Sequence, residues 1–153
     1  MIHKNEREFE NYIRSLIELY VTKKNSHIFP LVNKKAVDII ICKNHPTPHL
    51  YFIEVKFHLN KHGRLGFGSK GGGGFQPEIL LRKPVYFENN LRWVIGSEES
   101  DKIFFLTNEQ LRNYISGEKI GKKFNNIQKK IFIQEEGLTE KQFVTVLKEW
   151  ITK

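Results

Sequence analysis

Two acidic residues and a lysine interrupt two otherwise apolar stretches of this 153-residue chain, at Asp38, Glu54 and Lys56. Because side chains alternate between the faces of a strand, Glu54 and Lys56 point the same way if their segment is extended. The linking segment KNHPTPH carries two prolines and an asparagine, which predicts the turn of an antiparallel hairpin. A hairpin symmetric about Pro46 places Asp38 directly opposite Glu54, so two carboxylates and an ammonium share one patch.

This charged patch is expected to need a ligand. Like charges that face each other destabilise a sheet, and charges in strands buried on both faces are unfavourable unless they are paired or bind a metal. Both stretches are apolar apart from the three charged residues, as VDIII and LYFIEVKF show. We therefore expect a divalent cation at Asp38 and Glu54. The alternative is an ordinary charged face of a hairpin, exposed to solvent.

Composition and charge narrow the class of protein. A length of 153 residues suits a single domain over residues 1–153, and a formal net charge of +8 suits a polyanionic partner such as nucleic acid. The one cysteine, Cys42, excludes a disulfide framework and fits a reducing compartment. The amino terminus is too charged for a signal peptide, and no apolar run approaches the roughly 20 residues that span a bilayer. We expect a cytoplasmic protein without a membrane partner.

Hydrophobic periodicity and turn signals predict a helix and then three strands in the first half of the chain. The helix spans about Asn5–Lys24, because its apolar residues recur at the spacing of one helical face. The strands are expected at His27–Val32, Ala36–Cys42 and His49–His58. A glycine-rich loop, Lys61–Phe75, follows the third strand.

The second half is expected to add a crossover helix, further strands and closing helices. The crossover helix is predicted at Gln76–Phe87, where a proline is well placed for the first turn. Strands are predicted at Leu91–Gly96 and Lys102–Leu106, with a last short strand at Lys129–Gln134.

Two capping-box patterns mark the starts of two further helices. Thr107 with Gln110 opens a helix that is expected to end near Ile115, and Thr139 with Gln142 opens the closing helix.

The charged residues and the element order resemble the PD-(D/E)xK nuclease superfamily, which has the restriction-endonuclease-like fold. The matching pattern is an N-terminal helix, Asp38 on the second strand and Glu54-Val55-Lys56 on the third, followed by a helix and a strand. The segment EFENYIRSLIELY also resembles the opening FExxVxxLL helix of resolvase-like and Mrr-like members, although the usual proline before the aspartate is Val37 here. Over roughly residues 6–106, the resemblance implies a central mixed β-sheet flanked by helices in the order α-β-β-β-α-β, with C-terminal additions.

The resemblance implies a metal-dependent endonuclease that hydrolyses DNA phosphodiester bonds, with Mg²⁺ as cofactor and Mn²⁺ as its substitute. Asp38 and Glu54 would supply carboxylate ligands, and the Val55 carbonyl a third oxygen. The metal would lower the pKa of bound water and polarise the phosphate. Lys56 would orient that water or stabilise developing negative charge.

Two more residues are implied by the resemblance. Glu10 is the counterpart of a glutamate that joins the metal site in related enzymes, where it would hold a second cation or a metal-bound water. The alternatives are Glu6, one turn earlier, or no role for Glu10 beyond a solvated helix position. Gln76 stands where a glutamine or lysine lines the site in related nucleases, and the alternative is an ordinary residue at a helix start.

The glycine-rich loop KHGRLGFGSKGGGGF is a candidate DNA-contacting flap. Four consecutive glycines allow the backbone to approach a phosphate chain closely, and Lys61, Arg64 and Lys70 add positive charge. The alternative is a surface loop without a binding role. GFGSKG also fits GxGxxG, but it does not lead tightly from a strand into a helix and no suitably spaced acidic residue follows it, so we do not expect it to bind a nucleotide.

Histidines near the hairpin suggest two further possibilities. Cys42, His45 and His49 could form part of a zinc cluster, but no fourth ligand is evident and the prolines explain the turn without metal. His58 and His62 are expected to face solvent or phosphate.

The favoured function is restriction or defence, because an elaborate loop follows the strand that carries Glu54 and Lys56. Holliday-junction resolution and repair are the alternatives within the same chemistry, and RNA cleavage stays open. A non-catalytic nucleic-acid-binding module on the same fold is the alternative of another class, and the intact set of Asp38, Glu54 and Lys56 argues against it. Double-strand cleavage would call for a homodimer or a partner subunit.

Overall fold

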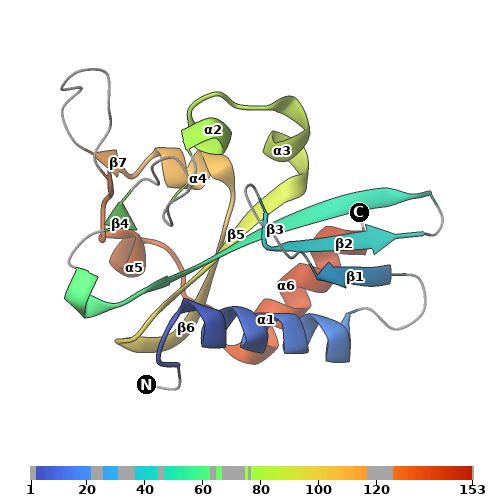
Figure 1. Ribbon diagram of the computed structural model, residues 1–153, viewed down its shortest axis with the longest axis horizontal. Coiled ribbons are helices and arrows are strands. Elements are labelled where there is room, and N and C mark those ends of the chain that lie inside the picture. Colours follow the sequence, from blue (N-terminus) through green and yellow to red (C-terminus); the bar gives the residue numbers. More distant parts are fainter. Residues whose placement is uncertain are drawn as a thin grey trace.

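The computed structural model of the protein describes residues 3–21, 26–30, 37–44, 47–62, 65–66, 75, 77–116 and 126–152 (Figure 1). The helices are α1 (Glu6–Tyr20), α2 (Pro77–Leu80), α3 (Val85–Asn90), α4 (Asn108–Arg112), α5 (Ile131–Gln134) and α6 (Glu140–Thr152), with a 3-10 turn at Asn60–His62. The strands are β1 (Ser26–Pro30), β2 (Ile39–Lys43), β3 (His49–His58), β4 (Leu65–Gly66), β5 (Leu91–Ser97), β6 (Ser100–Leu106), β7 (Ile115–Ser116) and β8 (Asn126–Ile127).

The larger of two sheets has five strands in the order β1-β2-β3-β5-β6. Strand β3 is antiparallel to β2 and parallel to β5, so the sheet is mixed. A parallel pair needs a crossover connection, and α2 and α3 lie in the connection from β3 to β5. Strands β4, β8 and β7 form the smaller sheet. The predicted mixed sheet with flanking helices is confirmed.

The hairpin of β2 and β3 has the register that its sequence predicts. Ile39 pairs with Ile53 and Lys43 with His49, which is symmetric about residue 46. Strand β2 begins at Ile39, so Asp38 lies directly before the strand and not within it, contrary to the prediction of a strand from Ala36. Strand β3 runs on past the last residue paired with β2 and continues alongside β5 to His58.

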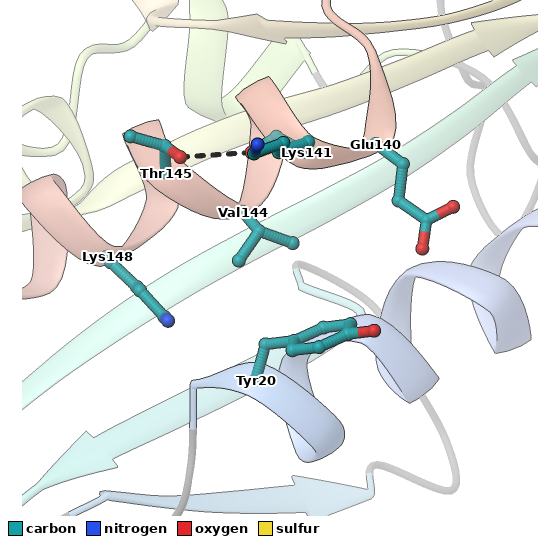
Figure 2. Close-up of a pocket in the computed structure, with 6 residues that line it drawn as sticks. All are labelled: Tyr20, Glu140, Lys141, Val144, Thr145 and Lys148. Atoms are coloured by element: carbon teal, nitrogen blue, oxygen red, sulfur yellow. Dashed lines mark hydrogen bonds between the residues drawn. The ribbon is translucent and has the colours of Figure 1, made fainter.

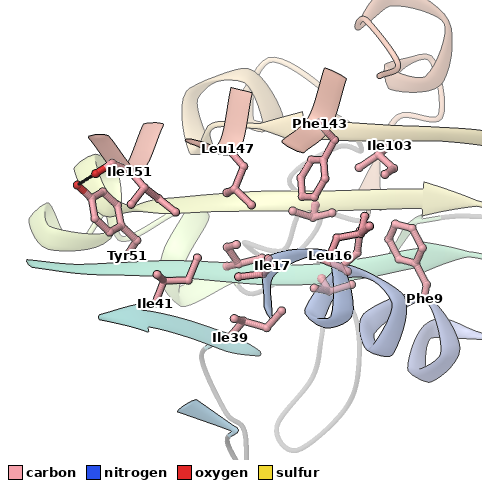
Figure 3. Close-up of a cluster of buried hydrophobic side chains, with 14 of the residues drawn as sticks. Phe9, Leu16, Ile17, Ile39, Ile41, Tyr51, Ile103, Phe143, Leu147 and Ile151 are labelled. Atoms are coloured by element: carbon pink, nitrogen blue, oxygen red, sulfur yellow. Dashed lines mark hydrogen bonds between the residues drawn. The ribbon is translucent and has the colours of Figure 1, made fainter. Parts of the chain in front are cut away.

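Two hydrophobic clusters cover opposite faces of the larger sheet. Side chains from α1 and α6 pack over one face, against residues such as Ile39 and Ile53 (Figure 3). The other face carries a cluster that includes residues of α2, α4 and α5. Strand β5 contributes Val94 to the first cluster and Trp93 and Ile95 to the second, as the alternation of side chains along a strand requires.

Helix α1 begins and packs as its sequence indicates. The side chain of Asn5 accepts a hydrogen bond from the backbone N–H of Glu8 at 2.9 Å, which satisfies one free donor of the first turn. The apolar face, which includes Phe9, Ile13 and Ile17, is buried. The helix ends at Tyr20, whereas the predicted end at Lys24 lies outside the described residues.

The predicted crossover helix Gln76–Phe87 is wrong, because the structure has two short helices with a break between them. Helix α2 ends at Leu80 and α3 begins at Val85. Pro84 precedes α3 and has no N–H to continue a helical hydrogen-bond ladder. Lys83 has a φ of 53°, and the residue before a proline is in any case disfavoured in the right-handed helical region.

The predicted strand Lys129–Gln134 is also wrong, because residues from Ile131 form the helical turn α5. The N–H of Gln134 donates to the carbonyl of Lys130 at 2.8 Å, as in a helix. The short apolar run IFIQ has no distinctive period, and the structure buries Ile131 while it leaves Ile133 86% exposed. The strand of this region is β8, a few residues earlier.

Both capping boxes are confirmed. The side chain of Gln110 accepts from the N–H of Thr107 at 2.8 Å and the Thr107 hydroxyl accepts from the N–H of Gln110 at 3.1 Å. Thr139 and Gln142 make the same reciprocal pair before α6. The helix opened by Thr107 ends at Arg112, so the predicted end near Ile115 is wrong.

The carboxyl end of α6 is fastened to the hairpin. The carbonyl of Ile151 accepts a hydrogen bond from the Tyr51 hydroxyl at 3.0 Å (Figure 3). The same carbonyl accepts a second hydrogen bond from Lys43 Nζ at 2.8 Å. Carbonyls of the last helical turn have no partner within the helix, so these two donors satisfy a group that would otherwise be left to solvent. No helix in the described ranges has the length and apolar character needed to cross a membrane.

Candidate active site

A strip of polar side chains occupies one face of β3 where this strand extends beyond β2. Glu54, Lys56 and His58 alternate with apolar residues that belong to the cluster under α1 and α6. Their exposed fractions are only 3%, 8% and 5%. Three polar side chains are therefore buried on the face opposite the α1 and α6 core.

Asp38 lies against this strip because the hairpin register brings it there. Its backbone N–H donates to the carbonyl of Ile53 at 3.0 Å, and its Oδ2 accepts from the N–H of Val55 at 2.7 Å. These two bonds flank Glu54, which confirms the predicted juxtaposition of Asp38 and Glu54. The N–H and carbonyl of one strand residue point to the same edge, so the Val55 carbonyl is directed toward the side on which Asp38 lies.

Lys56 connects two carboxylates. Its Nζ lies 3.2 Å from Glu54 Oε1 and 3.7 Å from Glu6 Oε1. Helix α1 supplies Glu6 from its first turn. The second oxygen of Glu54, Oε2, is buried and has no hydrogen-bond partner among the described residues. A buried carboxylate oxygen without a donor is unfavourable, so this atom marks the point at which the cluster is incomplete.

Burial and neighbouring charge govern the ionisation of the cluster. Burial, and then the charge of Asp38, raises the pKa of Glu54 to about 8, although Lys56 acts in the opposite direction. Burial lowers the pKa of Lys56, but the negative charges of Glu54 and Glu6 outweigh it and leave that pKa above its ordinary value. Without a further cation, Glu54 therefore holds a proton at neutral pH while Lys56 stays charged.

Helix α1 presents two glutamates near this site, one turn apart. Glu6 approaches Lys56, and burial raises the pKa of its carboxyl group while Lys56 lowers it. Glu10 is 8% exposed and forms an ion pair with Arg14 at 3.0 Å. The alternative of a solvated position for Glu10 is therefore wrong. A role for Glu10 in holding a metal stays a prediction.

The donor set suits a hard divalent cation that keeps several waters. Among the described residues no group of three or more His, Cys, Asp or Glu side chains is arranged to hold a metal ion. Mg²⁺ is usually held by one or two carboxylates together with water, which matches Asp38 and Glu54. The unpartnered Glu54 Oε2 and the raised pKa of its carboxyl group both fit a position where a cation would replace a proton.

Comparisons with protein-family models, with curated proteins and with solved structures find no match. What the site can do therefore follows from its own residues. The carboxylates of Asp38 and Glu54, together with the Val55 carbonyl, can hold a cation. The buried ammonium of Lys56 can stabilise negative charge on a bound anion.

Several predicted residues lie away from this cluster or outside the described part of the chain. Lys61 is exposed in the 3-10 turn that follows β3. Gln76, Arg64 and Lys70 lie outside the described residues, as does Gly71–Gly74. Nothing in the structure therefore bears on the predicted DNA contacts of Arg64 and Lys70 or on the predicted place of Gln76 in the active site.

Two predictions about histidines can be assessed. His58 was expected to face solvent or phosphate, but it is buried and its ring stacks on Phe132 with the centroids 6.0 Å apart. The prediction of a solvent-facing His58 is wrong, and strict alternation from Glu54 would have placed it in the buried strip. Cys42 pairs with Leu50, so His49 points to the other face of the hairpin from Cys42, and His45 lies outside the described residues.

Proposed function

We propose that this protein is a metal-dependent endonuclease that hydrolyses DNA, built on a restriction-endonuclease-like core. The observation that carries the proposal is the cluster at the end of β3, where Asp38 lies against Glu54 and Lys56 lies 3.2 Å from Glu54. Charges buried to this degree are unfavourable unless they are paired or bind a metal, so the burial of all three side chains supports a cation site over an ordinary surface charge pattern.

The arrangement of the elements supports the fold assignment. An N-terminal helix, three antiparallel strands, a helical crossover and a strand parallel to the third follow one another in the chain. Asp38 and the Glu54-Val55-Lys56 segment occupy the second and third strand positions that the resemblance implies, with Asp38 one residue before its strand.

Each residue has a distinct part in the proposed reaction. Asp38 and Glu54 would hold Mg²⁺ or Mn²⁺ with the Val55 carbonyl, and the bound cation would lower the pKa of water and polarise the phosphate. Lys56 would donate a hydrogen bond to the attacking water or to a phosphate oxygen as negative charge develops. Glu6 would hold the ammonium of Lys56 from the side of α1.

The biological role that we favour is restriction or defence, in which cleavage of both strands needs a second copy or a partner subunit. Holliday-junction resolution or repair is the alternative for the same chemistry. A non-catalytic nucleic-acid-binding module on this fold is the alternative of a different class. The buried Lys56 and the incomplete hydrogen bonding of Glu54 favour the catalytic function, because a purely binding fold gains nothing from that unsatisfied group.

A nuclease assay tests the proposal directly. The protein is incubated with supercoiled plasmid, single-stranded DNA, a four-way junction and RNA, each with Mg²⁺, with Mn²⁺ or with EDTA. Asp38→Asn, prepared in parallel, is the matched control for contaminating nuclease, because an amide oxygen can still accept from the Val55 N–H. Metal-dependent DNA cleavage by the wild type alone supports the proposal. Nucleic-acid binding without cleavage of any substrate would instead assign a binding module.

A further inference from the structure

A groove between α1 and α6 lies well away from the candidate active site. It has a volume of about 510 Å³ and is lined by Tyr20, Glu140, Lys141, Val144, Thr145 and Lys148 (Figure 2). Tyr20 follows Glu6 by 14 residues in α1, which separates them by about 21 Å along the helix axis. This volume falls within the usual range of ligand pockets.

The walls of the groove differ in chemical character. Tyr20, at the end of α1, is 40% exposed, and Figure 2 shows its ring below Val144 of α6. The α6 wall carries the exposed side chains of Lys141 and Lys148 with Thr145 between them. An accessible aromatic ring therefore lies opposite two cations.

The two lysines are available to a ligand. Neither has an ion-pair partner within the part of the chain that the structure describes. They are seven residues apart and thus lie on one face of α6, about 10 Å apart along its axis. Their flexible four-carbon stems allow both ammonium groups to reach phosphates of one ligand.

Glu140 places a carboxylate in the lining of the groove, at the amino-terminal end of α6. Its Oε2 accepts a hydrogen bond from the Tyr12 hydroxyl at 3.1 Å, which keeps a carboxylate at the amino-terminal end of α6. This charge disfavours a phosphate directly beside Glu140, and Lys148, eight residues further along the helix, is the lysine more distant from it. Neighbouring positions on a helix do not face each other, so Lys141 can still contact a phosphate that lies toward Lys148. A ligand that carries both an uncharged ring and phosphate fits these walls.

We propose that this groove binds a nucleotide unit, with its base against the ring of Tyr20 and its phosphates on Lys141 and Lys148. Aromatic side chains beside basic residues bind unpaired bases in this way without sequence preference. The net charge of +8 adds long-range attraction for such an anion. The unit is either a free nucleotide or part of a single strand. The site does not depend on the proposed cleavage reaction.

Binding is measured by fluorescence anisotropy in EDTA, in the Asp38→Asn background, so that cleavage plays no part. The probes are a labelled single-stranded DNA trinucleotide and a labelled adenosine diphosphate. We expect Tyr20→Ala to weaken binding roughly 5- to 150-fold, as for the loss of one stacked base, and Tyr20→Phe to retain it. Leu19→Ala is the matched control, because Leu19 is 60% exposed beside Tyr20 and does not line the groove.

The contribution of the two groove lysines to binding is tested with separate variants. Replacing Lys141 and Lys148 together with alanine is expected to reduce the slope of log affinity against log salt by about 1.4 for the trinucleotide, since each phosphate contact on a single strand contributes about 0.7. Lys129→Ala with Lys130→Ala is the control pair, because both residues are exposed and lie outside the groove. Circular dichroism melting verifies that each variant folds.

The outcomes distinguish a free nucleotide from a single strand as the ligand, and they test the groove independently of the proposed nuclease activity. Equal affinity for both probes identifies a free nucleotide, and binding of the trinucleotide alone identifies a strand; either result supports the site. Unchanged affinity in Tyr20→Ala, equal losses in the two lysine pairs, or tighter binding of a polyglutamate peptide than of either probe would overturn it. Because no step requires cleavage, a failure here leaves the nuclease assay unaffected, and the reverse holds too.

Discussion

The two charged regions of this protein, the cluster at the end of β3 and the groove between α1 and α6, place their charges in opposite environments. Lys56 in the cluster is 8% exposed and touches two carboxylates, whereas Lys141 and Lys148 in the groove are exposed and have no ion-pair partner among the described residues. Burial makes the ionisation of each group in the cluster depend on its neighbours. Exposure leaves the charges of the groove lysines screened by salt and accessible from solvent.

The largest expected effect is on cleavage, and it belongs to the buried cluster. Asp38→Asn or Glu54→Ala removes one of the two carboxylates that would hold the cation, so we expect loss of at least about 10³-fold in the rate of Mg²⁺-dependent plasmid cleavage. Wild-type cleavage by the Asp38 variant would refute the site.

Removal of the Lys56 ammonium should lower the cleavage rate without lowering the affinity for the metal. Lys56→Met keeps the buried aliphatic stem and removes the ammonium, and we expect the rate to fall about 10²- to 10³-fold, as when one donor to a developing anion is lost. Titration calorimetry should show that Mn²⁺ affinity is retained, because a lysine is not a ligand. A collapse of metal affinity would give Lys56 a structural role in place of a catalytic one.

The raised pKa of Glu54 predicts how metal-free stability varies with pH. The folded protein holds this proton up to about pH 8, whereas the ordinary value is 4.5, so the folded state binds more protons between these limits. The free energy of unfolding should therefore fall as pH rises, on the order of 2 kcal/mol between pH 5 and pH 7. Denaturant unfolding in EDTA measures this, and Glu54→Gln should flatten the curve. An equally steep curve in that variant would assign the effect to other groups.

The smallest expected effect is on stability, when one of the two groove lysines is replaced. Lys141→Ala and Lys148→Ala should each change the free energy of unfolding by less than about 0.5 kcal/mol, because exposed charges away from packed features contribute little. The same denaturant titrations provide the measurement. A larger destabilisation would mean that these lysines serve the packing of α6 and are not free for a ligand.

The sequence predicts the cluster better than its surroundings, for an identifiable reason. A symmetric turn and the alternation of side chains are local rules, and together they place Asp38 beside Glu54 with Lys56 on the same face. The rotation of α1 against the sheet is not local, so a sequence pattern that offers both Glu6 and Glu10 does not decide which one reaches Lys56.

Errors in the predicted elements have equally local causes. Pro84 signalled the break between α2 and α3, but the apolar residues on either side obscured it. The run IFIQ was too short to distinguish a strand from a helical turn. The groove could not be found from sequence at all, because Tyr20 and Lys148 stand more than a hundred positions apart and meet only through the packing of α1 against α6.

The hydrogen bond from Val55 to Asp38 gives the site an observable of its own. This backbone N–H, which continues the sheet where β2 has ended, is bonded to a side chain that is also expected to be a metal ligand. A redistribution of charge on that carboxylate alters the shielding and the solvent exchange of a single amide proton. The Val55 resonance in a nitrogen–proton correlation spectrum is therefore expected to report occupancy of the site during a metal titration, without a substrate, a fluorescent tag or a substitution.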